Sequence, residues 1–331
     1  MNSDIRYHIA SLAAVFLALG IGILVGTAFV GAPVVQRQTS LIRRLETNVG
    51  DLRRDTAARD NTERALADLV PGILHGKLAG RRILVVQTGG YRDATDAAVE
   101  ALQQAGASTV ARAILPTDTW RREMSAATAA ISDGDTIAEA VRAEARQLAP
   151  LLLRGDPGGV FSEPLQPYRD RGLVVSDTPL TGGPFRLIVL VGGTSLAAAL
   201  TGETDDSALQ TFLRQRDTPL IETWAARGVT VVGVEPVEAE VSFLRLYQSA
   251  GLSTIDAMDR AAGKIALPFA LLGEKGSYGL RPAADRALPA SLETLRLAPP
   301  PPSPAAPPLP RGPGSPVPTS PVLSSPGPDT L

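Results

Sequence analysis

The stretch RRILVVQTGG, residues 81–90, joins a short apolar run rich in β-branched side chains to a pair of glycines. The stretch FRLIVLVGGTS, residues 185–195, repeats this order. Apolar runs of this length alternate with segments of helical spacing through the middle of the chain. That alternation is typical of a parallel sheet with helices on both faces. The sequence therefore predicts a Rossmann-like α/β domain over residues 78–290.

The other elements of this domain follow from the same alternation. Further strands are expected at residues 108–115, 172–177 and 229–236. Helices are expected at residues 93–107, 136–153 and 204–217, followed by a short helix through Trp224.

A longer apolar stretch, DIRYHIASLAAVFLALGIGILVGTAFVGA, occupies residues 4–32. No residue from Ile9 to Val30 is charged, and a helix of that length spans about 33 Å, enough to cross a bilayer core of about 30 Å. A cleavable signal has a shorter apolar region, and Pro33 follows the possible cleavage point after Ala32. The sequence predicts an uncleaved transmembrane helix over residues 9–30, after a short flank at residues 1–8.

One face of this helix carries a small residue at every fourth position: Ala14, Ala18, Gly22 and Gly26. Small residues at this spacing let two helices approach closely in lipid, which predicts self-association as a dimer or higher oligomer. The alternative is that Gly and Ala are simply common in membrane helices.

The flanking charges bear on the orientation of the membrane helix. Arg37, Arg43 and Arg44 follow the helix, whereas Asp4 and Arg6 precede it, so the local count favours a cytoplasmic domain. A helix that starts within ten residues of the terminus is, however, the usual design of a signal anchor, and long domains translocate largely regardless of charge. We expect a single-pass protein of the cell membrane with a cytoplasmic N-terminus and an extracytoplasmic α/β domain.

Residues 36–70 are polar and helix-prone, with a heptad pattern that predicts a parallel coiled-coil stalk. Pro71-Gly72 is expected to end it. The apolar seam positions are Leu41, Leu45, Leu52, Leu66 and Leu69, and the polar ones are Asn48, Asp55, Arg59 and Thr62. The alternative is a single solvated helix.

Residues 298–331 contain half of the 28 prolines, together with Ser, Gly and Ala. Such a segment cannot bury enough apolar area to offset its chain entropy, so the sequence predicts a disordered, locally extended tail. The tail is either an inert spacer or a ligand for a proline-binding partner.

Composition argues against several classes of function. The net charge of −2 and the 4 % aromatic content give no indication of a nucleic-acid partner, and the chain has no cysteine. The glycine pairs Gly89-Gly90 and Gly192-Gly193 stand at strand ends, where α/β proteins bind ligands, but neither has the spacing of a nucleotide loop. No cofactor is expected, and no catalytic residue is assigned.

Metal ligands are scarce and scattered. The histidines are His8 and His75, and the methionines are Met1, Met124 and Met258. Copper(I) prefers several soft ligands together, so no metal site is assigned. A Ser-His-Asp triad could use only His75, and no G-x-S-x-G turn accompanies any serine.

Two carboxylates and a glycine-rich stretch remain as candidates. Asp256 and Asp259 lie three residues apart and are expected to share one helix face, either as a cation or acid–base pair or as the acidic start of a helix. In GEKGSYGLRPAADRALP, residues 273–289, Tyr278 and Arg281 form either a recognition surface or a packed closing loop, and we favour the loop.

The two ends of the chain together resemble the MctB-type copper transporter family of Gram-positive bacteria. The similarity lies in DIRYHIASLAAVFLALGIGILVG, residues 4–26, and in GLSTIDAMDRAAGKIAL with GSYGLRPAADRALP, residues 251–267 and 276–289, and it covers about residues 3–290. The resemblance marks a closing motif, of unknown role, at Asp256, Asp259, Gly263, Gly276, Tyr278 and Gly279.

The resemblance implies copper export or copper tolerance, in an envelope protein held by its N-terminal helix with its domain outside. A single helix cannot form a polar conduit, so direct transport would require an oligomer or a partner channel. The residues themselves favour a different reading, a non-enzymatic envelope scaffold that recruits wall or division proteins. A weaker alternative is an enzyme that binds a nucleotide or sugar.

Overall fold

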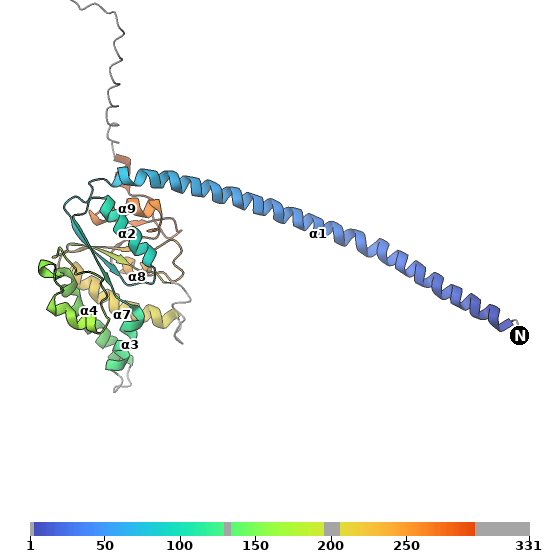
Figure 1. Cartoon of the computed structure of the whole chain (residues 1–331), viewed down its shortest axis with the longest axis horizontal. Helices are drawn as coiled ribbons and strands as arrows, with labels where there is room; N and C mark the ends of the chain where they lie inside the picture. The colour runs from blue at the N-terminus through green and yellow to red at the C-terminus, as the bar shows by residue number, and fades with distance from the viewer. Residues whose placement is uncertain (1–2, 129–133, 195–205, 295–331) are drawn as a thin grey trace, which may run out of the picture. The chain divides into compact units, whose positions relative to one another are not determined.

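The computed structural model describes residues 3–128, 134–194 and 206–294. A long helix, α1 (Ser3–Leu74), leads into a domain in which strands and helices alternate (Figure 1). The tail predicted at residues 298–331 lies outside the described residues.

Six strands form one sheet in the order β2-β1-β3-β4-β5-β6, and every pair is parallel. The strands are β1 (Arg82–Gln87), β2 (Thr109–Ile114), β3 (Leu187–Val191), β4 (Thr230–Val234), β5 (Ser253–Ile255) and β6 (Ser277–Tyr278). Because β2 and β3 lie on opposite sides of β1, the strand order reverses between β1 and β3. In open α/β sheets that point carries a crevice at the carboxyl ends of the strands.

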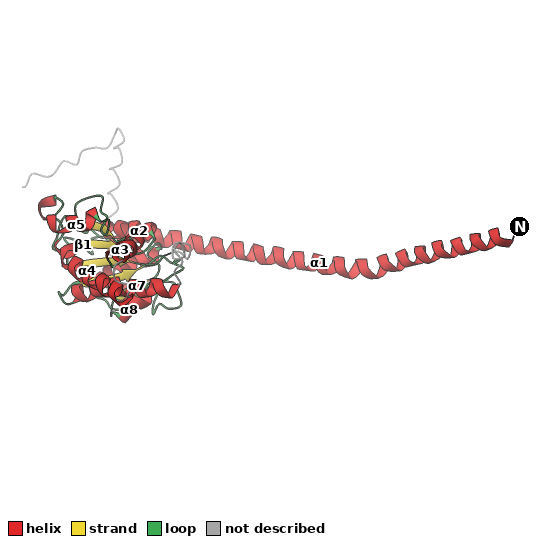
Figure 2. Ribbon diagram, turned by 90° about the horizontal axis from the view of Figure 1, so that it is seen from below, coloured by secondary structure: helices red, strands yellow, loops and turns green. Residues whose placement is uncertain are grey.

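Helices cover both faces of the sheet (Figures 1 and 2). The helices of the domain are α2 (Arg92–Gln104), α3 (Thr117–Ala127), α4 (Gly134–Arg154), α5 (Gln166–Asp170), α7 (Asp206–Ala225), α8 (Leu244–Ser249) and α9 (Ala261–Leu271). The described residues also form three short 3-10 turns, at Pro157–Gly159, Glu163–Leu165 and Ala290–Thr294. Helices α2 and α9 pack together on one face, whereas α4 and α7 pack together on the other.

The largest part of the core lies between the sheet and the α4–α7 pair. Trp120 and Trp224 are fully buried there, and each indole N–H donates to a backbone carbonyl. The Trp120 bond to Leu173 O is 2.8 Å long, and the Trp224 bond to Ala149 O is 2.9 Å long. Both rings therefore bury their apolar surface without leaving a polar group unpaired.

The α/β prediction is confirmed by the strands with long apolar runs. β1 and β3 are buried over nearly their whole length, as their sequences predict. The strand expected at residues 172–177 is wrong, because only Val175 forms an isolated antiparallel bridge, with Ile114. The N–H groups of Leu173 and Val174 donate instead to Tyr168 O, which closes a turn after α5.

Helix α1 is continuous and continues past Pro71-Gly72, so the expected stop there is wrong by a few residues. His75 N–H still donates to Pro71 O, and the chain turns at Gly76, whose φ is +72°. The segment Arg6–Gly26 is long and apolar enough to cross a membrane, and none of it is buried in the chain. The coiled coil remains a prediction.

The last turns of α1 are attached to the domain through α9. Val70 and Leu74 are buried, and the Glu63 carboxylate accepts the N–H of Ala261 at 2.6 Å. Ala261 begins α9, which has no side-chain cap of its own, so a carboxylate from α1 complements the positive end of that helix.

Candidate functional site

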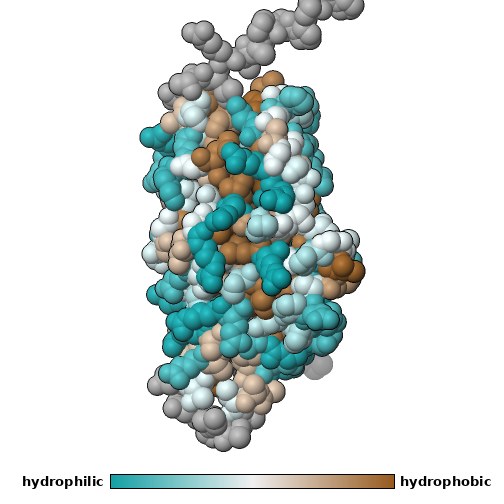
Figure 3. All heavy atoms as spheres, turned by 90° about the vertical axis from the view of Figure 1, so that its left-hand side faces the viewer, coloured by the Kyte–Doolittle hydropathy of each residue, from teal (hydrophilic) through white to brown (hydrophobic). Residues whose placement is uncertain are grey.

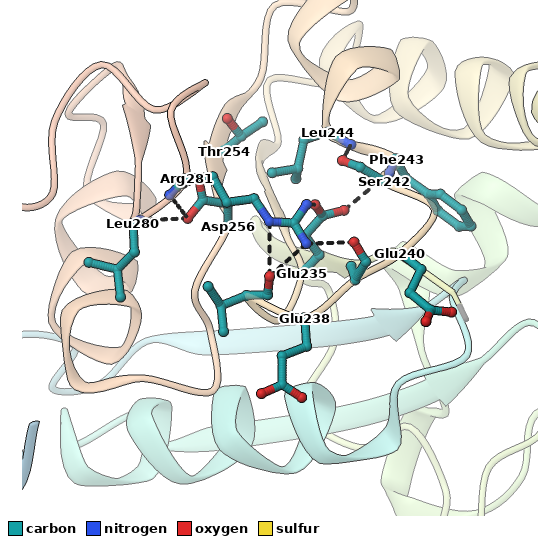
Figure 4. Close-up of polar contacts among 12 residues, drawn as sticks. Glu235, Glu238, Glu240, Ser242, Phe243, Leu244, Thr254, Asp256, Leu280 and Arg281 are labelled. Carbon is teal, nitrogen blue, oxygen red and sulfur yellow. Dashed lines mark hydrogen bonds and ion pairs between the residues drawn. The ribbon is translucent and has the colours of Figure 1, made fainter. Parts of the chain in front are cut away.

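Buried carboxylates follow two neighbouring strands at the carboxyl edge of the sheet. Glu235 comes directly after β4 and Asp256 directly after β5, and they are 0 % and 2 % exposed. Arg281, from the closing loop after β6, lies between them (Figure 4). The closing loop is therefore held against the sheet by charged groups.

Arg281 ties the closing loop to the segment after β4. Its Nη1 lies 2.8 Å from Glu235 Oε1. Its Nε and Nη2 donate to Val237 O at 3.0 and 2.7 Å, and Nη2 also donates to Ala239 O. Four contacts from one guanidinium fix the path of residues 235–239, which is a structural use of its planar donors.

Asp256 holds the same loop through its backbone. Its carboxylate accepts the N–H of Leu280 at 2.7 Å and the N–H of Arg281 at 3.2 Å. A Cβ at Gly279 would lie 1.7 Å from Asp256 Oδ1, and Gly279 has a φ of +146°. Only glycine satisfies both conditions, so Asp256 and Gly279 are one structural unit.

The other closing-motif residues also make structural contacts. Asp259 Oδ1 accepts Val237 N–H at 2.7 Å, and a Cβ at Gly263 would lie 2.0 Å from Ala257 O. A Cβ at Gly276 would lie 3.0 Å from the ring of Tyr278, which is buried. The structure therefore places the motif at the junction of β5, β6, α9 and the closing loop.

The expectation that Asp256 and Asp259 share a helix face is wrong. Both lie in the turn between β5 and α9, which begins at Ala261. The strand β5 ends only at Ile255, and the two carboxylates accept hydrogen bonds from different segments. Three-residue spacing implies a shared face only within a helix.

Burial controls the protonation of the two strand-end carboxyls. Burial raises the pKa of Glu235 to about 7, against the lowering effect of the Phe243 N–H at 3.1 Å and of the Arg281 charge. Burial also raises the pKa of Asp256, although backbone N–H groups bond its charged form. A carboxyl with a pKa near 7 changes charge close to neutral pH.

The glycine pairs meet at the crevice between β1 and β3. Gly89 N–H donates to Val191 O at 3.0 Å, and Gly90 N–H donates to Gly193 O at 2.8 Å. A Cβ at Gly89 would lie 2.2 Å from Gly193 O. These glycines allow two turns to approach closely, and the N–H groups of Gly89 and Gly90 are used within the protein.

A hollow of about 250 Å³ lies beside these turns. Its lining includes Gln87, Gly90, Thr117, Thr194 and Phe243. It occupies the position where open α/β sheets bind ligands.

A buried ion pair beneath the hollow was not anticipated from the sequence. Arg216 and Asp217 are both fully buried, with Nε 2.6 Å from Oδ1. Arg216 also donates to Leu115 O and Thr88 O at 3.2 Å each. Helical spacing could have indicated that Arg216 is buried, because it lies on the apolar side of α7, three residues after the buried Leu213.

The histidines and the described methionines noted in the sequence do not come together in the structure. His8 and His75 are exposed, whereas Met124 on α3 and Met258 after β5 are buried. Within residues 3–128, 134–194 and 206–294, no three His, Asp or Glu side chains are grouped to hold a metal ion.

The small-residue face of α1 is exposed along Ala14, Ala18, Gly22 and Gly26. A Cβ added at Gly22 or Gly26 meets nothing within 4 Å. This face is therefore available for contact within a membrane, and its self-association stays a prediction.

The chain was compared with protein families and with curated proteins. A family model described as "Copper transport outer membrane protein, MctB" matches residues 3–289. No curated protein matches the chain. The family match includes the apolar helix, the α/β domain and the whole closing motif.

Proposed function

Since the chain belongs to the MctB family of copper transport outer membrane proteins, we propose that it acts in copper efflux or copper homeostasis at the cell envelope. The observation that carries this proposal is the extent of the match, residues 3–289, which joins the membrane-length helix to the α/β domain. Copper is the cargo in this proposal.

The copper pathway is proposed to form from several copies of the chain or from a partner channel. One apolar helix, Arg6–Gly26, supplies no polar route through lipid, because backbone groups there are satisfied only within the helix. Two exposed features support assembly: the small-residue face of α1, and Leu52 and Leu69 of the stalk, which are 65 % and 58 % exposed. The proposed assembly is a parallel dimer or a higher oligomer.

We propose that the α/β domain is not an enzyme and needs no cofactor. The strand-end groups support this assignment, because they bond to other groups of the protein. Glu235 accepts the Phe243 N–H and pairs with Arg281, and Asp256 accepts the Leu280 N–H. The domain is instead proposed to carry contacts to the rest of the copper system.

The proposed location is a single-pass protein of the cell membrane, with its N-terminus in the cytoplasm and its domain outside. The family description names the outer membrane, so the location needs a direct test. Separating the membranes and labelling an exposed Cys introduced at Ser125 on α3 with a membrane-impermeant maleimide would decide both points, since the chain has no cysteine of its own.

Copper handling is tested by deleting the gene and restoring the full chain. Cells without the protein should accumulate more copper, measured by mass spectrometry, and should tolerate less copper in the medium. Zinc content serves as the control and should not change. Equal copper content and equal copper tolerance in the two strains would overturn the proposal.

A further inference from the structure

Arginines gather at the amino edge of the sheet, opposite the carboxylate-rich site. Arg82 begins β1, and Arg186 directly precedes β3. Ile83 pairs with Leu187, so Arg82 and Arg186 lie at neighbouring positions at the starts of adjacent strands. Arg154 ends α4, and Arg227 lies just before β4. The amino edge therefore concentrates positive charge.

These arginines lack ionic partners among the residues that the structure describes. No carboxylate there lies within 4 Å of Arg82, Arg154, Arg186 or Arg227, although seven other arginines of the α/β domain and Lys264 do form ion pairs. Arg186 donates instead to Arg227 O at 3.0 Å. Like charges held together without a counterion favour an anion nearby.

Three of these arginines surround an apolar hollow of about 490 Å³. Its apolar lining comprises Leu153, Phe185 and Val229 with Pro150 and Pro184, and its charged rim comprises Arg154, Arg186 and Arg227. Figure 3 shows the face of the domain on the left-hand side of Figure 1, where brown apolar patches lie between teal hydrophilic side chains.

We propose that this arginine-rimmed hollow binds an acidic peptide segment of a partner protein. One bulky apolar side chain of the peptide enters the hollow, and flanking carboxylates bond the guanidinium groups, which suit carboxylates through paired N–H donors. The volume lies within the range of sites that bury compact ligand groups.

The shape of the hollow favours a peptide over a membrane surface. A membrane-binding face presents protruding apolar side chains that enter the lipid. Here the apolar side chains form the floor of a recess, since Leu153, Phe185 and Val229 are only 7 %, 1 % and 8 % exposed. The proposal does not depend on copper transport.

The test measures fluorescence anisotropy with the full chain in detergent micelles. The probe is a fluorescein-labelled peptide, GEELFEEG, and the control peptides are GKKLFKKG and GEEGGEEG. The acidic apolar peptide should bind at least tenfold more tightly than either control, and added salt should weaken its binding.

Matched variants locate the binding site. Changing Arg154, Arg186 and Arg227 together to Gln should weaken binding of the acidic apolar peptide at least tenfold. The control changes Arg53, Arg59 and Arg64 of α1 to Gln, which alters the net charge equally at exposed positions that form no ion pair with the described residues, and should leave binding unchanged. Tryptophan fluorescence checks that both variants are folded.

Three results would overturn the proposal. Equal weakening in both triple variants would indicate a general charge effect. Equal binding of GEEGGEEG would show that the hollow takes no apolar side chain, and this comparison holds for the unmodified chain even if a variant fails to fold. Binding to phosphatidylglycerol vesicles without binding to the peptide would assign the face to lipid.

Discussion

Gly279→Ala tests whether the closing motif holds the domain together. The new Cβ would lie 1.7 Å from Asp256 Oδ1, so the carboxylate must move away. It would then lose the N–H of Leu280 at 2.7 Å and the N–H of Arg281 at 3.2 Å. The positive φ of +146° adds backbone strain for any residue with a side chain.

The expected loss in the free energy of unfolding is the sum of the backbone strain and the lost hydrogen bonds. A non-glycine residue at such a φ costs about 1–3 kcal/mol, and losing hydrogen bonds to a carboxylate costs about 2 kcal/mol more. We therefore expect Gly279→Ala to lower the free energy of unfolding by about 4 kcal/mol. Gly273→Ala is the matched control, because Gly273 has a φ of +106° but an added Cβ meets nothing within 4 Å. Gly273→Ala should cost only the backbone strain, about 1–3 kcal/mol, without the loss of the two hydrogen bonds.

The assay is urea unfolding of the full chain in micelles, followed by tryptophan fluorescence. Trp120 and Trp224 are both fully buried in the α/β domain, so their emission reports on that domain. The double variant Asp256→Ala/Gly279→Ala should lose less unfolding free energy than the sum of the two single variants. The reason is that the carboxylate overlapped by the new Cβ is absent in the double variant. A Gly279→Ala loss no larger than that of Gly273→Ala, or strict additivity in the double variant, would refute this account.

Three further predictions concern the buried residues Glu235 and Asp217 and the exposed leucines of the stalk. Because burial raises the pKa of Glu235 to about 7 from an ordinary value of 4.5, its protonated form stabilises the fold at low pH. That contribution, on the order of 3 kcal/mol, is lost as the pH rises through 7, so the free energy of unfolding should fall between pH 5 and 8 in the parent chain and less so in Glu235→Gln. Asp217→Asn should lower the free energy of unfolding by about 3–5 kcal/mol in the same urea assay, because it leaves Arg216 charged and buried without its partner. Leu52→Asp combined with Leu69→Asp should reduce the oligomer measured by light scattering in micelles if the stalk is a coiled coil, and an unchanged mass would contradict that assembly.

The strands predicted from the sequence are β2, expected at residues 108–115, and the three strands with longer apolar runs. β1 and β3 each carry four consecutive buried aliphatic residues, and β4 carries three buried valines interrupted only by Gly233. Glycines lie close to the ends of each of these short runs, which favours strands over a longer buried helix. β5 and β6 have three and two residues and contain Ser and Thr, so their strand character depends on neighbours supplied by the fold.

Single residues of the site could be predicted from the sequence, but the contacts between them could not. Asp256 and Gly279 could be singled out one by one, but their contact depends on the pairing of Ile255 with Tyr278, which no local pattern fixes. Glu235 was not singled out, although its place directly after an apolar strand put it at the carboxyl edge of the sheet. The arginine cluster at the amino edge of the sheet was also not predicted from the sequence, because its arginines come from segments far apart in the chain.

The strand order also governs when the domain can form during synthesis. β1 leaves the ribosome early, but its partner β3 begins only at Leu187, and β6, which completes the sheet, ends at Tyr278. Pairings over such long separations form slowly and late. Nearly the whole domain must therefore be synthesised before its sheet is complete, and until then the nascent chain exposes apolar strands to chaperones and to aggregation.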